Sequence, residues 1–327
     1  MIIIFNKDAT LDDISNVTKR FIDEKFEYEL MTEGELSLLI ITTGSYDKRW
    51  EFGRRIAHLP AVAEVHFERR PHPAIDSIDE GFIKVGDLKI GRGAKPAVIA
   101  GPPYLDTYQA AVTILSDLAR LGVSVFKGAE YRPDFKLKWD VSLERALKIN
   151  GQLHGKFLMP HLMPLLNRDS ISEILDACDA LIVETRDIHE EALREKLAQA
   201  ARPVFLIRDQ RYTVGEFLDA AEMLCNDGLA KIALIEAGSR TAVSPGGATI
   251  DIRSLIAMKE DSPFPVLAYP SPVAATSKEV IRQSLASLAA GADGILLDVH
   301  PNPPDTYIGP NRVINYDELS EVLGFLK

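Results

Sequence analysis

The pattern of hydrophobic and polar residues divides the chain into two parts. In residues 1–70, apolar runs and amphipathic stretches follow the order strand, helix, strand, strand, helix, strand. This order in about seventy residues is typical of the ferredoxin-like split βαβ unit. The expected strands are MIIIF, FEYEL, LSLLIITT and AVAEVHFE, and the expected helices run from Asp12 to Glu24, with Thr10 as the N-cap, and from about Asp47 to His58.

Residues 71–93 form a connecting region. The segment RRPHPAIDSIDEG is rich in proline and charge, which is typical of a linker. The next segment, FIKVGDLKIGRG, predicts a short β-hairpin that turns at Gly86-Asp87.

Residues 94–327 repeat one unit, a short and almost continuously apolar strand followed by a helical stretch. Such strands are typical of a parallel sheet buried on both faces, and eight units close a (β/α)8 barrel. A doubly wound open sheet is the alternative, but no glycine fingerprint follows the first strand. The eight expected strands are PAVIAG, GVSVFKG, GKFLMP, ALIVET, PVFLIR, KIALIE, FPVLAY and DGILLDV, and the helices between them include 107–121, 190–201, 214–226 and 277–290.

Composition narrows the class of protein. The chain has 327 residues, 46% of them hydrophobic, and a net charge of −11, which disfavours nucleic acid or an anionic membrane as the main partner. No apolar run approaches the ~20 residues of a membrane span, and the first residues lack the features of a signal peptide. We expect a cytoplasmic protein in which Cys178 and Cys225 are buried free thiols.

Chemistry in such a barrel lies at the carboxyl ends of the strands. The residues that follow the expected strands are often basic, and guanidinium groups match phosphate and carboxylate geometry. We therefore predict an anion pocket, although each cation alone could form a rim ion pair with Glu130, Glu184, Asp209 or Glu236. The basic residues are Lys127, Arg132, Arg186, Arg208 and Arg240.

Six segments carry a resemblance to a known family: VIAGP, KGAEYRP, TRD, EAGSRT, YPS and AAGADGILLDVHPNP. The sequence resembles the 3-deoxy-D-arabino-heptulosonate 7-phosphate (DAHP) synthase family over nearly its whole length. It is most similar to the branch with an N-terminal ferredoxin-like domain, which is related to 3-deoxy-D-manno-octulosonate 8-phosphate synthase.

The resemblance implies a reaction in which phosphoenolpyruvate attacks the aldehyde of erythrose 4-phosphate and a divalent metal orients that aldehyde. It places the cations on the phosphoenolpyruvate side at Lys127, Arg132, Arg186 and Arg240. The family motif that grips the aldehyde phosphate reads RPDFK here, so Asp134 would repel a phosphate unless Lys136 or Lys138 reaches it.

The four metal-ligand positions of the family are the main departure. They read Pro103, Pro272, Asp298 and Ile308, and proline and isoleucine carry no ligand atom. Asp305 is a nearby substitute for the last of them. A lysine of the phosphoenolpyruvate site reads Ile207, and a glutamate of the third strand reads Pro160. We therefore expect no metal and no other cofactor.

The favoured hypothesis is a metal-independent enzyme of altered carbon–carbon bond or aldolase-type chemistry, linked to shikimate and aromatic metabolism. The candidate acid/base groups are His161, Glu184 and Glu236, and Lys127 could also form a Schiff base. Tyr104 lies beside the vacated metal position, and His300 is interpreted as mainly structural.

Two alternatives stay open. One is a non-catalytic regulatory or ligand-binding paralogue, and the other is a working DAHP synthase with relocated metal ligands. In each case the expected partner is a small phosphorylated or carboxylated metabolite. The protein is expected to form a homo-oligomer, either a dimer or a tetramer.

Overall fold

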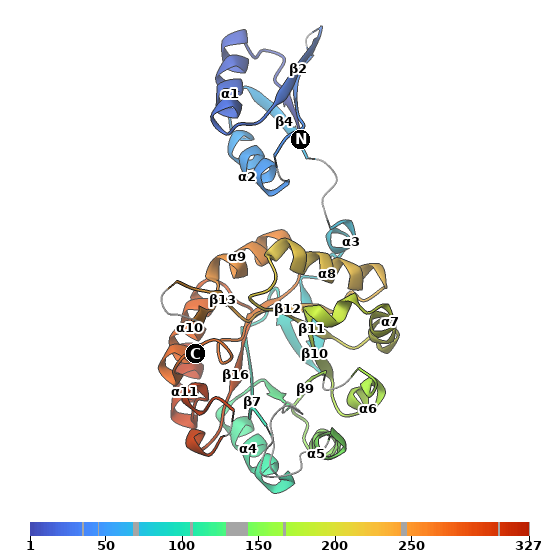
Figure 1. Cartoon of the computed structure of the whole chain (residues 1–327), viewed down its shortest axis with the longest axis vertical. Coiled ribbons are helices and arrows are strands. Elements are labelled where there is room, and N and C mark those ends of the chain that lie inside the picture. The colour runs from blue at the N-terminus through green and yellow to red at the C-terminus, as the bar shows by residue number, and fades with distance from the viewer. Residues whose placement is uncertain are drawn as a thin grey trace. The chain divides into compact units, whose positions relative to one another are not determined.

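The computed structural model describes residues 1–34, 36–44, 46–67, 72–104, 107–128, 143–165, 168–242, 247–306 and 308–326. The chain forms two compact units, Met1–Pro71 and His72–Lys327 (Figure 1). None of the helices in these residues is long and apolar enough to cross a membrane.

The N-terminal unit is a four-stranded antiparallel sheet with two helices on one face (Figure 1). The strand order is β2-β3-β1-β4, as expected from the split βαβ element order. Thr10 caps the first helix, and its hydroxyl accepts the Asp13 N–H while the Asp13 carboxylate accepts the Thr10 N–H. The elements are β1 (Ile2–Phe5), α1 (Leu11–Asp23), β2 (Tyr28–Glu33), β3 (Leu36–Ile41), α2 (Tyr46–Ile56) and β4 (Val62–His66).

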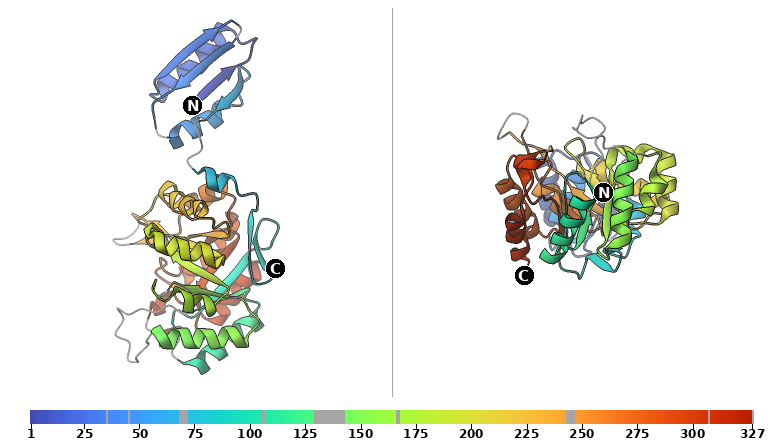
Figure 2. Two further views of the ribbon diagram at one scale, coloured as in Figure 1. Left: turned by 90° about the vertical axis from the view of Figure 1, so that its right-hand side faces the viewer. Right: turned by 90° about the horizontal axis from the view of Figure 1, so that it is seen from below.

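The second unit is a closed barrel of eight parallel strands surrounded by helices (Figures 1 and 2). This confirms the barrel predicted from the apolar periodicity. The strands are β7 (Ala97–Gly101), β8 (Val125–Lys127), β9 (His161–Pro164), β10 (Ala180–Glu184), β11 (Val204–Arg208), β12 (Ile232–Glu236), β15 (Val266–Ala268) and β16 (Gly294–Asp298). The helices are α4 (Tyr108–Leu121), α5 (Leu143–Lys156), α6 (Ile171–Asp176), α7 (Glu191–Ala200), α8 (Val214–Asn226), α9 (Ile252–Asp261), α10 (Ser277–Ala289) and α11 (Tyr316–Phe325).

Alternate residues of each barrel strand face opposite sides. Ile99, Val125 and Phe205 pack in the barrel interior, whereas their neighbours, such as Val98 and Phe126, pack against the helices. Because the side-chain period of a strand is two, this alternation fixes which polar side chains point into the mouth. The positions that face the barrel interior or mouth include Gly101, Lys127, Glu184, Ile207 and Asp298. The positions that face the surrounding helices include His161, Arg208 and Glu236.

The amino-terminal end of the barrel is closed by a hairpin of β5 (Phe82–Val85) and β6 (Leu88–Gly91) (Figure 2). Ile83, Val85 and Ile90 of the hairpin belong to the same apolar cluster as the barrel interior. The turn lies at Gly86-Asp87 as predicted, with Gly86 at φ 57°. The open end of the barrel is therefore the carboxyl end.

The third barrel strand differs from the sequence prediction. The expected strand GKFLMP instead contains the end of α5, which runs to Lys156, and β9 begins at His161. The run FLMPHLMP is apolar on both sides of Pro160, so its composition did not reveal the strand. Phe126 pairs with His161, which sets the register. The carboxyl end of this strand is therefore Pro164, and His161 lies at its amino-terminal end.

Candidate active site

The mouth of the barrel contains a buried ion pair between strands that are not adjacent. The Nζ atom of Lys127, at the end of β8, lies 2.9 Å from Oδ1 of Asp298, at the end of β16. The Lys127 side chain is only 1% exposed, and that of Asp298 is 13% exposed. The strand between them, β7, ends in Gly101, which has no side chain in the gap.

Tyr269 joins this pair from a third strand end. It directly follows β15, and its hydroxyl lies 3.0 and 3.2 Å from the two carboxylate oxygens of Asp298. The Lys127 ammonium lies 5.8 Å from the centre of the Tyr269 ring. The Asp298 N–H donates to the Ser271 hydroxyl at 3.0 Å. Lys127 and Tyr269 therefore both hold the Asp298 carboxylate. Tyr269 was not among the site residues predicted from the sequence.

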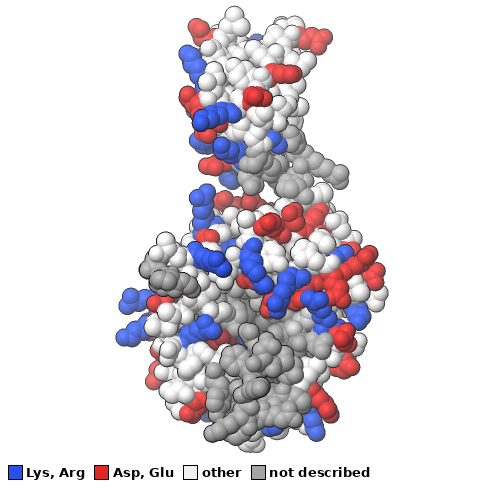
Figure 3. Space-filling model, in the orientation of Figure 1, with Lys and Arg blue, Asp and Glu red and all other residues white. Residues whose placement is uncertain are grey.

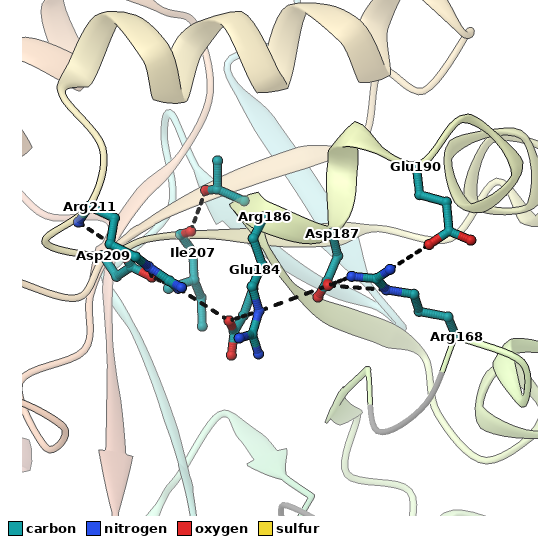
Figure 4. Close-up of polar contacts among 9 residues, drawn as sticks. Arg168, Glu184, Arg186, Asp187, Glu190, Ile207, Asp209 and Arg211 are labelled. Atoms are coloured by element: carbon teal, nitrogen blue, oxygen red, sulfur yellow. Dashed lines mark hydrogen bonds and ion pairs between the residues drawn. The ribbon is translucent and has the colours of Figure 1, made fainter.

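A second charged cluster lies across the mouth, at the ends of β10 and β11 (Figure 4). The Glu184 carboxylate lies 2.8 Å from the Arg186 Nε and 3.6 Å from the Arg211 Nη2. Arg211 also pairs with Asp209, and this pairing raises the pKa of Arg211. Burial alone would raise the pKa of Asp209, but the hydrogen bonds from Arg211 outweigh it and lower that pKa. The two arginines are 55% and 51% exposed, so both guanidinium groups are accessible to solvent.

The same network continues on η1 (Thr185–His189). Arg168 pairs there with Asp187 and, at 2.6 Å, with Glu190 (Figure 4). Arg168 follows the end of β9 at Pro164. It was not predicted as a site residue because the sequence placed the end of this strand at Pro160. Basic and acidic side chains are interspersed on the face of the barrel unit drawn in Figure 3. Because Lys127, Arg168, Arg186 and Arg211 each pair with a carboxylate, the described part of the mouth is close to charge balance.

Arg208 and Glu236 lie on the outward side of their strands, not in the mouth as the sequence analysis expected. The Arg208 Nε donates to Glu236 at 2.6 Å, and its Nη1 donates to the Tyr212 carbonyl at 2.6 Å. Glu236 is fully buried and also accepts the N–H groups of Gly238 and Asp251. Burial raises the pKa of Glu236, and Arg208 and the two N–H groups oppose that rise. This pair holds the loop after β12 against the start of α9.

His161 is also outside the mouth, because it starts β9 and faces α5. Its ring contacts Phe126 and His154, and its Nδ1 lies 2.8 Å from the Met159 carbonyl oxygen. A carbonyl oxygen only accepts hydrogen bonds, so Nδ1 carries the hydrogen when the ring is neutral. The pKa of His161 is lowered to about 4, mainly because the ring is buried.

The other predicted site residues make contacts of their own, outside the two charged clusters described above. The Tyr104 hydroxyl donates to the Asp305 carbonyl at 3.0 Å and so joins two mouth loops. Arg240 is exposed, and its Nε donates to the Gln210 side chain at 3.4 Å. The Nδ1 of His300 lies 2.8 Å from the Asn302 carbonyl. Arg132, Asp134 and Lys136 lie outside the described residues.

The four positions of the family's metal ligands do not fit a divalent metal. Pro103, Pro272 and Ile308 have no side-chain donor atom, and Asp298 is already bound by an ammonium and a hydroxyl. Asp305, the nearby substitute, accepts a hydrogen bond from the Asn302 side chain at 2.7 Å. Within the described residues, no group of three or more His, Cys, Asp and Glu side chains could hold a metal ion.

Comparison with known families decides the relationship. A sequence profile of the DAHP synthetase I family matches residues 57–327, which is most of the chain. The chain belongs to the DAHP synthetase I family. The matched residues include all eight barrel strands.

Individual proteins resemble the chain at 23–27% identity. A phospho-2-dehydro-3-deoxyheptonate aldolase of Thermotoga maritima is 27% identical, over 100% of this chain and 97% of that protein. Its crystal structure covers 99% of this chain and 95% of the solved chain, with a TM-score of 0.71 and 26% identity. A 2-dehydro-3-deoxyphosphooctonate aldolase of Desulfotalea psychrophila is 23% identical, over 72% of this chain and 90% of that protein.

Proposed function

We propose that this chain is an aldolase-type enzyme that acts at the barrel mouth without a divalent metal. Its substrate class would be small phosphorylated or carboxylated metabolites, and the reaction would make or break a carbon–carbon bond. The family membership supports the reaction type, because both relatives named above are aldolases of phosphorylated molecules. The observation that carries the absence of metal is the Lys127 ammonium bound to Asp298, the one carboxylate left among the four ligand positions.

The arginines beside Glu184 are suited to bind the substrate anion. Arg186 and Arg211 are half exposed and share one carboxylate, so their guanidinium groups can turn toward a phosphate at small cost. A guanidinium offers two parallel N–H groups to a phosphate or carboxylate. Glu184, released from these partners, would then be an acid/base group in the mouth.

The experiment is a turnover assay on the full chain with phosphoenolpyruvate and a series of aldose phosphates of four and five carbons. The assay is run in EDTA and again with added Mn²⁺. We expect phosphoenolpyruvate to be consumed at the same rate in both. Arg186→Met should lower the rate at least about tenfold through lost substrate binding, whereas Arg253→Met, an exposed arginine of α9, should not change it. Consumption only with Mn²⁺ would show a working synthase with relocated ligands.

A second candidate is a ligand-binding or regulatory protein without turnover. The charge balance in the described part of the mouth favours it, because Lys127, Arg186 and Arg211 each pair with a carboxylate. It predicts no consumption of phosphoenolpyruvate but a clear thermal shift. A ligand at a hundred times its Kd stabilises the folded state by about 2.7 kcal/mol.

A further inference from the structure

The positive charge next to Asp298 in the barrel mouth is supplied by a side chain of the protein, the ammonium of Lys127. Lys127 is 1% exposed, and its Nζ lies 2.9 Å from Asp298 in the open end of the barrel. Burying an ammonium is costly unless a counter-charge is close, and Asp298 supplies that charge. Within the described residues, Nζ makes this ion pair but no hydrogen bond. Its N–H groups therefore lack an acceptor among these residues, and a ligand oxygen that reached the buried Nζ would supply one.

A divalent metal at this carboxylate would meet two obstacles. It would have a single protein ligand among the four family positions, because the other three carry no donor atom. It would also lie against the ammonium that the same carboxylate binds, and like charges repel strongly at such distances. The Asp298 carboxylate thus already has two partners, the Lys127 ammonium and the Tyr269 hydroxyl.

We infer that Lys127 takes the place of the divalent metal and donates from Nζ to an anionic or carbonyl oxygen of the bound ligand. Asp298 is the counter-charge that holds the ammonium there, and Tyr269 positions Asp298. The identity of the ligand rests on the proposed function, but the cation assignment does not. Positive charge at a fixed point can polarise a carbonyl oxygen, as a metal ion does.

The test measures binding of phosphoenolpyruvate and of inorganic phosphate to the full chain by calorimetry in EDTA. The wild-type protein should bind with the same affinity when Mn²⁺ replaces EDTA. Lys127→Ala should weaken binding about 10- to 100-fold, the value of one charged hydrogen bond. Ethylammonium, which restores the charge and fills most of the truncated space, should recover most of that affinity. Lys84→Ala, an exposed lysine of β5 at the other end of the barrel, should leave binding unchanged.

The double variant Lys127→Ala with Asp298→Asn guards against misfolding, because it removes both charges of the pair together. It should bind as weakly as Lys127→Ala, and ethylammonium should not rescue it, since the counter-charge is gone. Circular dichroism and the Tm of each variant show that the fold is intact. Unchanged binding in both variants would overturn the inference.

The outcomes separate this inference from the proposed function. Binding that depends on Lys127 but is accompanied by no turnover supports the internal cation and contradicts the enzyme. Stoichiometric Mn²⁺ in the wild-type protein, with binding that EDTA abolishes, overturns the internal cation even if turnover occurs. A wild-type protein that binds neither phosphoenolpyruvate nor phosphate also overturns it.

Discussion

The ammonium of Lys127 lies 2.9 Å from the carboxylate of Asp298 although β7 separates their strands. The residue between them is Gly101, which pairs with Asp298 in the β7–β16 ladder. A Cβ atom on Gly101 would overlap the Lys127 carbonyl oxygen. The site therefore depends on a backbone approach that only glycine allows.

Gly101→Ala should destabilise the barrel by about 3 kcal/mol or more, because the overlap is with backbone and cannot be relieved by turning a side chain. Urea unfolding measures the loss. Gly155→Ala is the matched control, since Gly155 lies in the last turn of helix α5 with nothing within 4 Å of the added Cβ. That change should stabilise by roughly 0.5–1 kcal/mol. Equal stabilities of the two variants would contradict the close approach.

Glu236→Gln should cost about 3–5 kcal/mol of unfolding free energy, because the buried Arg208 charge then keeps only the Asp251 carboxylate, 3.9 Å from its Nη2. Adding Arg208→Met should recover part of that loss, since the poorly compensated charge is then removed. Chemical denaturation of the single and double variants checks this. If Glu236 were instead an acid/base group of the mouth, Glu236→Gln would abolish turnover without loss of stability.

Much of the fold could be predicted from periodicity. Helix α8 runs from Val214 to Asn226, as predicted, because Thr213 and Glu216 form a capping box before an amphipathic stretch. The hairpin turn at Gly86 was predicted from its glycine and the alternating residues around it. The start of β9 was not, because prolines stand on both sides of His161 within one apolar run.

The candidate site was predicted less well, for a related reason. Strands buried on both faces are apolar at every position, so their sequence does not show which residues face inward. Arg208 and Glu184 both end such strands, but one faces the helices and the other faces the mouth. Only the register of the closed barrel separates them. Tyr269 was missed because its role depends on a carboxylate of the neighbouring strand.

The burial of His161 should make stability depend on pH. Its folded-state pKa of about 4 lies below the usual value of 6.5. As pH falls from 6.5 to 4, the unfolded chain therefore takes up a proton that the folded chain refuses, and stability decreases. This group accounts for a loss of up to about 3 kcal/mol across that range.

His161→Phe should flatten this part of the stability profile, which urea unfolding at several pH values can record. His189→Gln, a change of an exposed histidine on η1, should leave the profile as it is in the wild-type protein. A wild-type profile that is flat between pH 6.5 and 4 would contradict the neutral, buried state of His161.

Glu184 competes with a bound anion for Arg186 and Arg211, so Glu184→Gln should tighten the binding of inorganic phosphate. We expect a gain of about three- to tenfold, which corresponds to roughly 0.7–1.4 kcal/mol, with stability changed by less than about 0.5 kcal/mol because the pairs are exposed. Glu190→Gln is the control, because Glu190 pairs with Arg168 instead. Calorimetry at low and high salt measures both variants, and the gain should shrink at high salt as exposed charges are screened. Weaker phosphate binding in Glu184→Gln would mean that Glu184 orients the two arginines for the anion instead of competing with it.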